Sequence, residues 1–159
     1  MKIILQRVSS ADVLIDGCEK RGIGGGLLVL LGICGGDTEG ISSFMAEKTA
    51  NLRIFDDADE NMNLSLLDIG GDALVISNFT LYANSRKGRR PSFIEAARPE
   101  TALPLYENFA RALEFAGVKR VETGEFGAHM DVSLTNDGPV TIILDSEEIM
   151  PAGYGAAKG

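Results

Sequence analysis

Residues 24–33, GGGLLVLLGI, place a cluster of glycines directly before an apolar run. Leu27–Ile33 is apolar apart from one glycine, which is typical of a buried strand. The glycine cluster at 22–26 could suggest a phosphate-binding loop, but Leu27 stands where a dinucleotide fingerprint has its third glycine. A strand also follows the cluster, where the fingerprint requires a helix. We therefore predict a hairpin turn at 22–26 that leads into a buried strand.

Other apolar segments predict further strands. Ile3–Val8 and Val13–Ile15 have the pattern of one interrupted strand, and Gly17 marks the turn after it. Ala73–Ile76 predicts a short buried strand that leads directly into Ser77. These segments indicate a fold with a substantial sheet.

The segment NDGPVTIIL, residues 136–144, joins a turn signal to a β-branched run. Its Asn-Asp-Gly turn would be an adequate hairpin connection between strands at Val132–Thr135 and Val140–Leu144. Pro139 cannot donate to a sheet ladder and is usually found at strand edges or starts. From these residues alone, the proline either begins the second strand or has a separate role.

Two amphipathic segments predict helices. Asp37 or Thr38 caps the first of them. The second follows Pro99, and we place its start near Thr101 so that Pro104 lies in the first turn. The apolar faces are Ile41, Phe44, Met45 and Leu52 in the first helix, and Leu103, Tyr106, Phe109 and Leu113 in the second.

Strands clustered at both ends of the chain, around two helices, indicate an α+β fold. A chain of 159 residues is long enough for one domain that buries about 70% of its unfolded surface. We assign residues 1–146 to this domain. We predict that residues 147–159 form a flexible C-terminal tail.

The composition is that of a soluble globular protein, with 45% hydrophobic and 24% charged residues. No apolar run approaches the ~20 residues that cross a bilayer, and Gln6 and Arg7 interrupt the N-terminal apolar segment too early for a signal peptide. Cys18 and Cys34 do not suggest a disulfide framework. We therefore expect a cytoplasmic protein with no membrane partner.

The residues that usually build metal sites and catalytic triads are scarce. His129 is the single histidine, which argues against a histidine-based metal site, and the two cysteines have no evident third and fourth ligand. A Ser-His-Asp triad would have to use His129, whose place beside Met130 is more typical of a surface or packing residue. We predict no metal and no cofactor.

A strongly basic segment interrupts an otherwise acidic chain. Residues 86–90, RKGRR, carry four positive charges, and no Asp or Glu occurs from Ala73 to Ile94, although the net charge is −8. The net charge argues against a general nucleic-acid coat but does not exclude a local basic site. A solvated surface loop is the simpler alternative, and the local reversal of sign favours a phosphate-bearing partner.

The segment SNFTL, residues 77–81, places polar groups where an apolar strand ends, which is a frequent position for binding residues. Alternatively, its hydroxyl groups are hydrogen-bonded locally. A nucleophilic Thr80 would need an adjacent base, and its close sequence neighbours supply none. Chemistry without a base or a metal suits a reactive substrate such as an activated ester, for which backbone N–H groups and a positioned water suffice.

Seven segments give the chain a specific resemblance: LQRV, NLRIF, MNLSLLD, SNFTLYA, RKGRRPSF, FGAHM and NDGPVT. In this order and spacing the chain resembles the D-aminoacyl-tRNA deacylases from Met1 to about Asp145. That family hydrolyses the ester between a D-amino acid, or glycine, and the terminal ribose of tRNA. The resemblance implies a homodimer without a metal. It also implies a mixed, mostly antiparallel, β-barrel-like sheet with two main helices.

The family's pocket motif matches SNFTL. Carried over residue by residue, the resemblance makes Phe79 and Thr80 catalytic and assigns substrate binding to Ser77, Asn78 and Met130. The family usually has glutamine where this chain has Asn78, and the shorter amide would need a water to reach the same partner. This departure concerns the role of that side chain, not the activity.

The family's chirality motif is a Gly-Pro pair with a cis peptide bond that enters the active site of the partner subunit. It falls on Gly138 and Pro139, so the proline would fix the orientation of the Gly138 carbonyl. Gly138 has no side chain and lets the backbone approach a ligand closely. The resemblance also implies that aminoacyl-tRNA is the partner of the protein. The residues expected to bind its RNA are Arg86, Lys87, Arg89 and Arg90.

Three functions remain open at this point. The first is stereospecific hydrolysis of D-aminoacyl-tRNA, including glycyl-tRNA. The second is a related deacylase with a trans Gly-Pro pair and relaxed chirality, although such relatives alter the SNFTL and NDGPVT segments. The third is a non-catalytic RNA-binding module, which the basic loop supports and the acidic composition does not.

Overall fold

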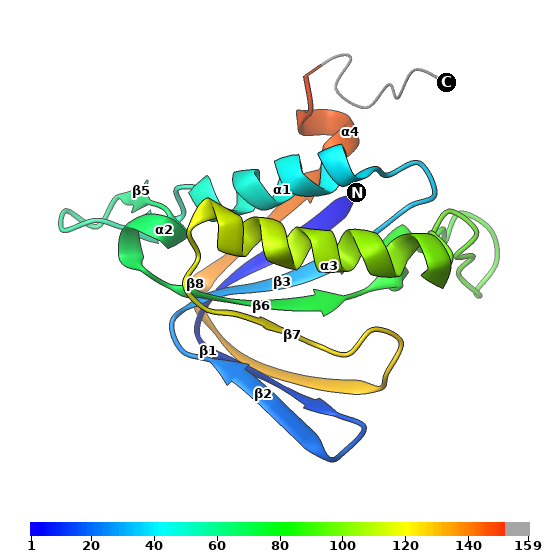
Figure 1. Cartoon of the computed structure of the whole chain (residues 1–159), viewed down its shortest axis with the longest axis horizontal. Coiled ribbons are helices and arrows are strands. Elements are labelled where there is room, and N and C mark those ends of the chain that lie inside the picture. Colours follow the sequence, from blue (N-terminus) through cyan, green and yellow to red (C-terminus); the bar gives the residue numbers. More distant parts are fainter. Residues whose placement is uncertain (152–159) are drawn as a thin grey trace.

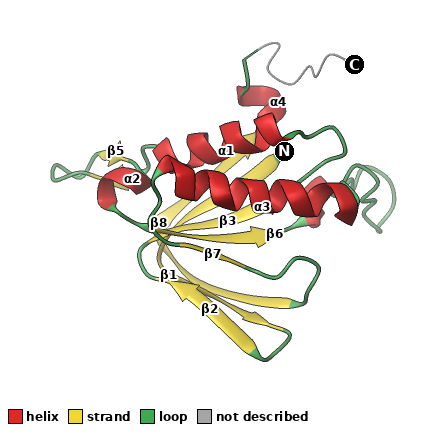
Figure 2. Ribbon diagram, in the orientation of Figure 1, coloured by secondary structure: helices red, strands yellow, loops and turns green. Residues whose placement is uncertain are grey.

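The computed structural model describes residues 1–151 as a curled main sheet with helices across one side, together with a small two-stranded sheet (Figure 1). Figure 2 shows the strands fanning out beneath the two long helices. The strands are β1 (Lys2–Ile15), β2 (Glu19–Ile23), β3 (Gly26–Gly32), β4 (Phe55–Asp56), β5 (Met62–Leu64), β6 (Asp72–Ser77), β7 (Val121–Thr123) and β8 (Met130–Asp145). The helices are α1 (Glu39–Asn51), α2 (Leu66–Ile69), α3 (Pro99–Ala116) and α4 (Ser146–Ile149), and Phe79–Tyr82 form a 3₁₀ turn, η1.

The main sheet is built around β1. This strand pairs antiparallel with β3 along its first half, with β2 along its second half, and with β8 along almost its whole length. Beyond β3 the sheet continues with β6 and β7, both in parallel pairing. The predicted α+β fold with a mixed, mostly antiparallel, barrel-like sheet is confirmed.

The apolar run that begins at Leu27 is buried on both faces of the sheet. Leu27, Val29 and Leu31 belong to the core between the sheet and the helices, whereas Leu28 belongs to a second core on the opposite face. A strand that is covered on both faces has no solvent side, so its sequence does not alternate. The neighbouring strand β6 divides its residues between the two cores in the same way.

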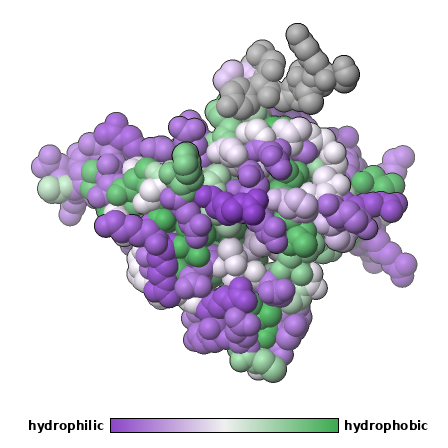
Figure 3. Space-filling view, viewed as in Figure 1, coloured by the Kyte–Doolittle hydropathy of each residue, from purple (hydrophilic) through white to green (hydrophobic). Residues whose placement is uncertain are grey.

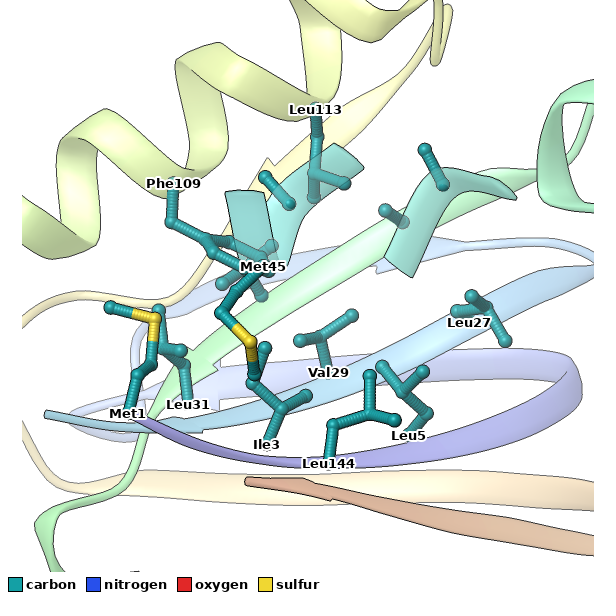
Figure 4. Close-up of a cluster of buried hydrophobic side chains, with 14 of the residues drawn as sticks. Met1, Ile3, Leu5, Leu27, Val29, Leu31, Met45, Phe109, Leu113 and Leu144 are labelled. Atoms are coloured by element: carbon teal, nitrogen blue, oxygen red, sulfur yellow. The ribbon is translucent and has the colours of Figure 1, made fainter. Parts of the chain in front are cut away.

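The two long helices pack on the first core with the predicted apolar faces, with one exception. Figure 4 shows Phe109 and Leu113 of α3 pointing toward the sheet, near Met45 of α1. Leu103, which was predicted to lie on this face, is 39% exposed. The Ser42 hydroxyl donates to the Leu105 carbonyl across the helix pair at 2.9 Å.

The helix starts partly match the prediction. Thr38 is the N-cap of α1, and its hydroxyl accepts a hydrogen bond from the Ile41 N–H. Asp37 is instead buried, and its carboxylate accepts hydrogen bonds from the Met1 ammonium at 2.6 Å and from the Cys34 N–H at 2.8 Å. The predicted start of α3 was wrong, because the helix begins at Pro99 and contains Pro104 in its interior.

Both predicted hairpins are wrong, for the same reason. The glycine cluster is a kink: β2 and β3 pair with one edge of β1 and not with each other. The residues around Pro139 belong to one strand, β8, and both of its halves pair with β1. Similarly, β1 is continuous, and its interruption is only a shift of register opposite β8 near Val8 and Ser10. In both places the turn signal marked an irregularity in the path of the chain along β1 and not a reversal of its direction.

The C-terminal tail predicted from Glu147 begins inside the short helix α4, whose Ser146 hydroxyl accepts a hydrogen bond from the Met1 ammonium. Residues 152–159 of the predicted tail lie outside the described residues.

None of the helices within residues 1–151 is long and apolar enough to cross a membrane. Hydrophilic residues cover much of the face seen in Figure 3, with smaller apolar areas between them.

We expect Phe109→Ala to lower the free energy of unfolding by about 3–5 kcal/mol, because the ring is fully buried and its removal leaves a cavity. Phe115→Ala on the same helix is the matched control. Its ring is 96% exposed, so we expect a change within about 0.5 kcal/mol. Urea denaturation of both variants measures the difference, and equal losses would contradict this account of the core.

Candidate active site

The SNFTL segment lies where β6 ends against the end of β3. The Asn78 N–H donates to the Leu31 carbonyl at 2.8 Å, and η1 begins at the next residue. The neighbouring Gly32 leaves room for this turn, because a side chain there would lie 2.9 Å from the Leu81 Cβ and 3.1 Å from the Asn78 carbonyl oxygen. Close packing of the two strand ends thus fixes the backbone of the segment.

The side chains of Asn78 and Thr80 are bonded to each other. The Asn78 Oδ1 accepts from the Thr80 N–H at 3.2 Å and from the Thr80 hydroxyl. Local hydrogen bonding of this segment, the simpler of the two interpretations, is therefore present. An amide oxygen does not act as a base at neutral pH, so this contact orients the Thr80 hydroxyl without activating it as a nucleophile.

A cavity of about 510 Å³ opens beside this turn. It brings together four of the predicted site residues: Ser77, Asn78, Phe79 and Met130. Thr80 does not line it but is exposed next to it. Most of the wall is apolar, as is usual for a pocket that holds an organic ligand with a few polar groups placed for orientation.

Two aromatic rings stand at this cavity. Phe79 is 57% exposed and Phe93 is 37% exposed, and their rings meet edge to face with centroids 5.1 Å apart. Large exposed aromatic side chains are costly to leave in water and are common where a ligand covers them. The pair therefore marks one side of the cavity as a contact surface.

Tyr106 of α3 holds the loop before β8, which forms part of the cavity wall. Its hydroxyl lies 2.8 Å from the Val75 carbonyl oxygen and 3.2 Å from the Gly124 carbonyl oxygen, so it joins β6 to the loop before β8. Burial raises the pKa of Tyr106 above its ordinary value and keeps it a neutral donor. This loop also supplies Phe126 and Ala128 to the cavity.

Sequence reasoning missed several cavity residues, chiefly Phe93, Arg98 and Phe126. Phe93 stands in the RKGRRPSF segment, where only the basic residues were assigned a role. Phe126 stands in the FGAHM segment, in which only Met130 was assigned a role. Arg98 is exposed and forms no ion pair within residues 1–151. In the sequence, the only signal for a role of Arg98 was a positive charge at the start of a helix.

Gly138 and Pro139 do not line this cavity. They lie in an exposed excursion of β8, and the bond between them is cis. Asn136 closes the excursion: its side-chain amide accepts from the Val140 N–H at 2.7 Å and donates to the Val140 carbonyl at 3.1 Å. Gly138 has φ +141°, and a side chain there would lie 2.7 Å from the Val140 nitrogen, so glycine is required.

Arg7 of β1 holds the base of this excursion. Its side chain is only 7% exposed, and it donates to the Asp137 carbonyl at 2.9 Å, the Ile54 carbonyl at 3.0 Å and the Asp56 carboxylate at 3.1 Å. A buried guanidinium with these directed bonds fixes the positions of its acceptors. The Gly138–Pro139 segment is thus supported from within the sheet.

None of the four basic residues lines the main cavity. Arg86, Lys87 and Arg90 line a separate cavity of about 270 Å³, whereas Arg89 lines neither of the two.

Within residues 1–151, no group of three or more His, Cys, Asp or Glu side chains is placed to hold a metal ion.

Fold and site together define a small α+β protein with a ligand-sized cavity at the carboxyl end of a parallel strand. The family model of the D-Tyr-tRNA(Tyr) deacylases matches residues 4–145. A D-aminoacyl-tRNA deacylase of Thermomicrobium roseum is 58% identical over 149 residues, which cover 94% of this chain and 96% of that protein. One of Bacillus velezensis is 52% identical over 148 residues, 93% and 100% of the two chains.

Two solved structures share the fold. One, described as c-Myc DNA Unwinding Element Binding Protein, has a TM-score of 0.84 and 38% identity over 91% of this chain and 98% of its own. The other, a probable eukaryotic D-amino acid tRNA deacylase, has a TM-score of 0.79 over 90% and 97% of the two chains. Its identity is 18%, so that likeness concerns the fold alone. The chain belongs to the D-Tyr-tRNA(Tyr) deacylase family.

We expect Arg7→Lys to lower the free energy of unfolding by about 1–3 kcal/mol, because one ammonium cannot replace three directed bonds and leaves a buried carbonyl unpaired. Arg111→Lys is the control, since Arg111 is exposed on α3 and has no ion pair within residues 1–151. Chemical denaturation compares the two variants. Similar, small changes in both would show that the Arg7 network adds no stability.

Proposed function

We propose that this protein hydrolyses the ester bond of D-aminoacyl-tRNA and releases the D-amino acid and tRNA. The observation that carries the proposal is that Ser77, Asn78 and Phe79, the family's motif, line one cavity together with Met130. Family membership supplies the reaction, and the cavity offers a place for the aminoacyl end of the substrate. The activity would remove wrongly charged D-amino acids before translation uses them.

The chemistry requires little from the side chains because the ester is already reactive. Attack by water places a negative charge on the carbonyl oxygen, and backbone N–H groups stabilise such an oxyanion. The Phe79 N–H has no acceptor among the described residues, whereas the Thr80 N–H is held by Asn78. Phe79 therefore acts through its backbone, and the ribose 2′-hydroxyl of the substrate assists the attacking water.

The proposed active form is a homodimer in which the Gly138–Pro139 segment of each chain enters the cavity of its partner. Three features support it. The segment is exposed and internally braced by Asn136. Ile143 on the same strand is 73% exposed. Within residues 1–151, β8 pairs only with β1, so its outer edge is open to another chain.

Such a segment selects by exclusion. A rigid carbonyl placed close to the α-carbon of the bound amino acid collides with an L side chain, while a D side chain points away from it. A site of this kind cannot reject a substrate that is smaller than those it admits. Glycyl-tRNA should therefore be hydrolysed as well.

In this proposal the tRNA is bound through the basic loop, residues 86–90, and the enzyme acts in the cytoplasm, where charged tRNA is used. A second candidate function is nucleic-acid binding without catalysis. A solved structure 38% identical to this chain is described as a DNA unwinding element binding protein, and the basic loop is compatible with such a role. A deacylation assay separates the two functions.

We expect D-alanyl-tRNA and glycyl-tRNA to be deacylated and L-alanyl-tRNA to be spared at equal enzyme concentration. The physical reason is steric exclusion at the Gly138 carbonyl. The assay follows the loss of labelled amino acid from each tRNA. Resistance of glycyl-tRNA equal to that of L-alanyl-tRNA would show that the site grasps a D side chain, and hydrolysis of all three would show relaxed chirality.

Gly138→Ala is the structural arm of this experiment. An added methyl group would lie 2.7 Å from the Val140 nitrogen, so the segment must shift. We expect the ratio of D-alanyl to L-alanyl turnover to fall. Gly40→Ala is the matched control, because the nearest atom to an added methyl group there, the Thr38 Oγ1, is 3.8 Å away.

We expect Thr80→Ala to retain turnover, with a loss of about tenfold. Its hydroxyl donates to the Asn78 amide, and one lost hydrogen bond is worth about 1 kcal/mol, with some further loss from a less ordered turn. Steady-state kinetics of Thr80→Ala, with the exposed Thr101→Ala as the control, test this. Complete loss of activity together with an acyl group trapped on Thr80 would instead identify a covalent nucleophile.

A further inference from the structure

The basic loop has a defined shape. Asn84 and Ser92 close its base through two backbone hydrogen bonds, Asn84 N–H to Ser92 carbonyl at 2.8 Å and Ser92 N–H to Asn84 carbonyl at 2.9 Å. The Asn84 Oδ1 also accepts from the Arg86 N–H at 3.1 Å. Gly88 turns the chain at the tip with φ +70°. A loop that is fastened in this way can hold its side chains around a common space.

That space is the cavity of about 270 Å³ lined by Asn84, Arg86, Lys87, Arg90 and Ser92. All five side chains can donate hydrogen bonds, and three of them carry a positive charge. Arg89 lies between two of these residues in the sequence but does not line the cavity. The tertiary structure thus separates one of the four basic residues from the other three.

The convergent charges have no counter-ion within the described chain. Arg86, Lys87 and Arg90 form no ion pair within residues 1–151. The acidic side chain in contact with the cavity lining is Glu95, whose carboxylate lies 3.5 Å from the Asn84 amide nitrogen. Three cations around one space repel each other, and a bound anion relieves that repulsion.

The cavity is also close to the candidate active site. Ser92 lines the small cavity, and the next residue, Phe93, lines the large one and contacts Phe79. An anion held here therefore lies near the end of a substrate whose ester occupies the large cavity. For an aminoacyl-tRNA, the anion at this place is a backbone phosphate.

We propose that the cavity among Arg86, Lys87 and Arg90 is a cradle for one backbone phosphate near the 3′ end of the tRNA, and that Arg89 takes no part. The proposal rests on the proposed function for the identity of the ligand. Guanidinium groups donate in pairs to phosphate oxygens, and the hydroxyl and amide at the base of the loop complete the set of donors. A phosphate contact carries no sequence information, so the cradle serves tRNAs of every acceptor identity.

The test compares Arg90→Gln with Arg89→Gln, two neighbours of equal charge. Binding of uncharged tRNA is measured between about 50 and 200 mM salt. We expect Arg90→Gln to flatten the slope of log affinity against log salt by roughly 0.7–0.9 and to weaken binding about tenfold. Arg89→Gln should leave the slope unchanged. In D-alanyl-tRNA hydrolysis, Arg90→Gln should raise KM and leave kcat unchanged, because the contact is the same in the ground and transition states.

A second measurement locates the phosphate. Acceptor-end RNAs carry a neutral methylphosphonate at successive positions, and each is bound to the unaltered protein and to Arg90→Gln. At the position held by the cradle, the methylphosphonate and Arg90→Gln together should reduce the binding free energy no more than either change alone. Additive losses at every position would overturn the cradle.

The outcomes separate this proposal from the proposed function. Equal slope changes in Arg89→Gln and Arg90→Gln would overturn the cradle in favour of a diffuse basic loop and leave deacylation intact. An unchanged salt slope in both variants, together with normal hydrolysis, would show that the loop takes no part in tRNA binding. If the unaltered protein fails to hydrolyse D-alanyl-tRNA but binds tRNA with the predicted difference between the variants, the cradle stands and the proposed function fails.

Discussion

Burial of both faces of β3 and β6 is the constraint on which the rest of the structure depends. Helices α1 and α3 cover one face of these parallel strands, and the curl of the main sheet covers the other, so two cores share the same strands. Strands packed on both faces have little room to shift, because every side chain is surrounded by close-packed neighbours. The end of β6 is therefore held in place, and so is the part of the cavity wall that it forms.

The two parts of the proposed active site depend on this sheet in different ways. The SNFTL turn rests directly on the ends of β3 and β6, through the Asn78 N–H and the space above Gly32. The Gly138–Pro139 segment leaves the sheet and needs its own support, which Asn136 supplies from within the segment and Arg7 from β1. A gate that works by exclusion requires this support, since a segment free to move would yield to an L side chain.

The charge of the molecule is unevenly distributed: the chain as a whole is negative, and one loop is positive. The chain has a net charge of −8, yet the loop between η1 and α3 concentrates positive charge around a small cavity near the candidate active site. General negative charge disfavours indiscriminate contact with RNA, whereas a local cationic site retains the attraction where it is needed. Under the proposed function, the protein surface repels most of the tRNA, and the basic loop holds its reactive end.

The sequence by itself determined the α+β class, the buried strands, both long helices, the polar turn after β6 and the basic loop. Each of these follows from local periodicity, a strand end or a run of charge. Only the tertiary structure decided that β8 is one strand and not a hairpin, and that the glycines kink the path from β2 to β3. It alone placed Arg7 on the Asp137 carbonyl, Phe93 at the large cavity and Arg89 outside the small one. The reason is that strand pairing and the convergence of side chains depend on contacts between residues far apart in the chain, which local patterns do not encode.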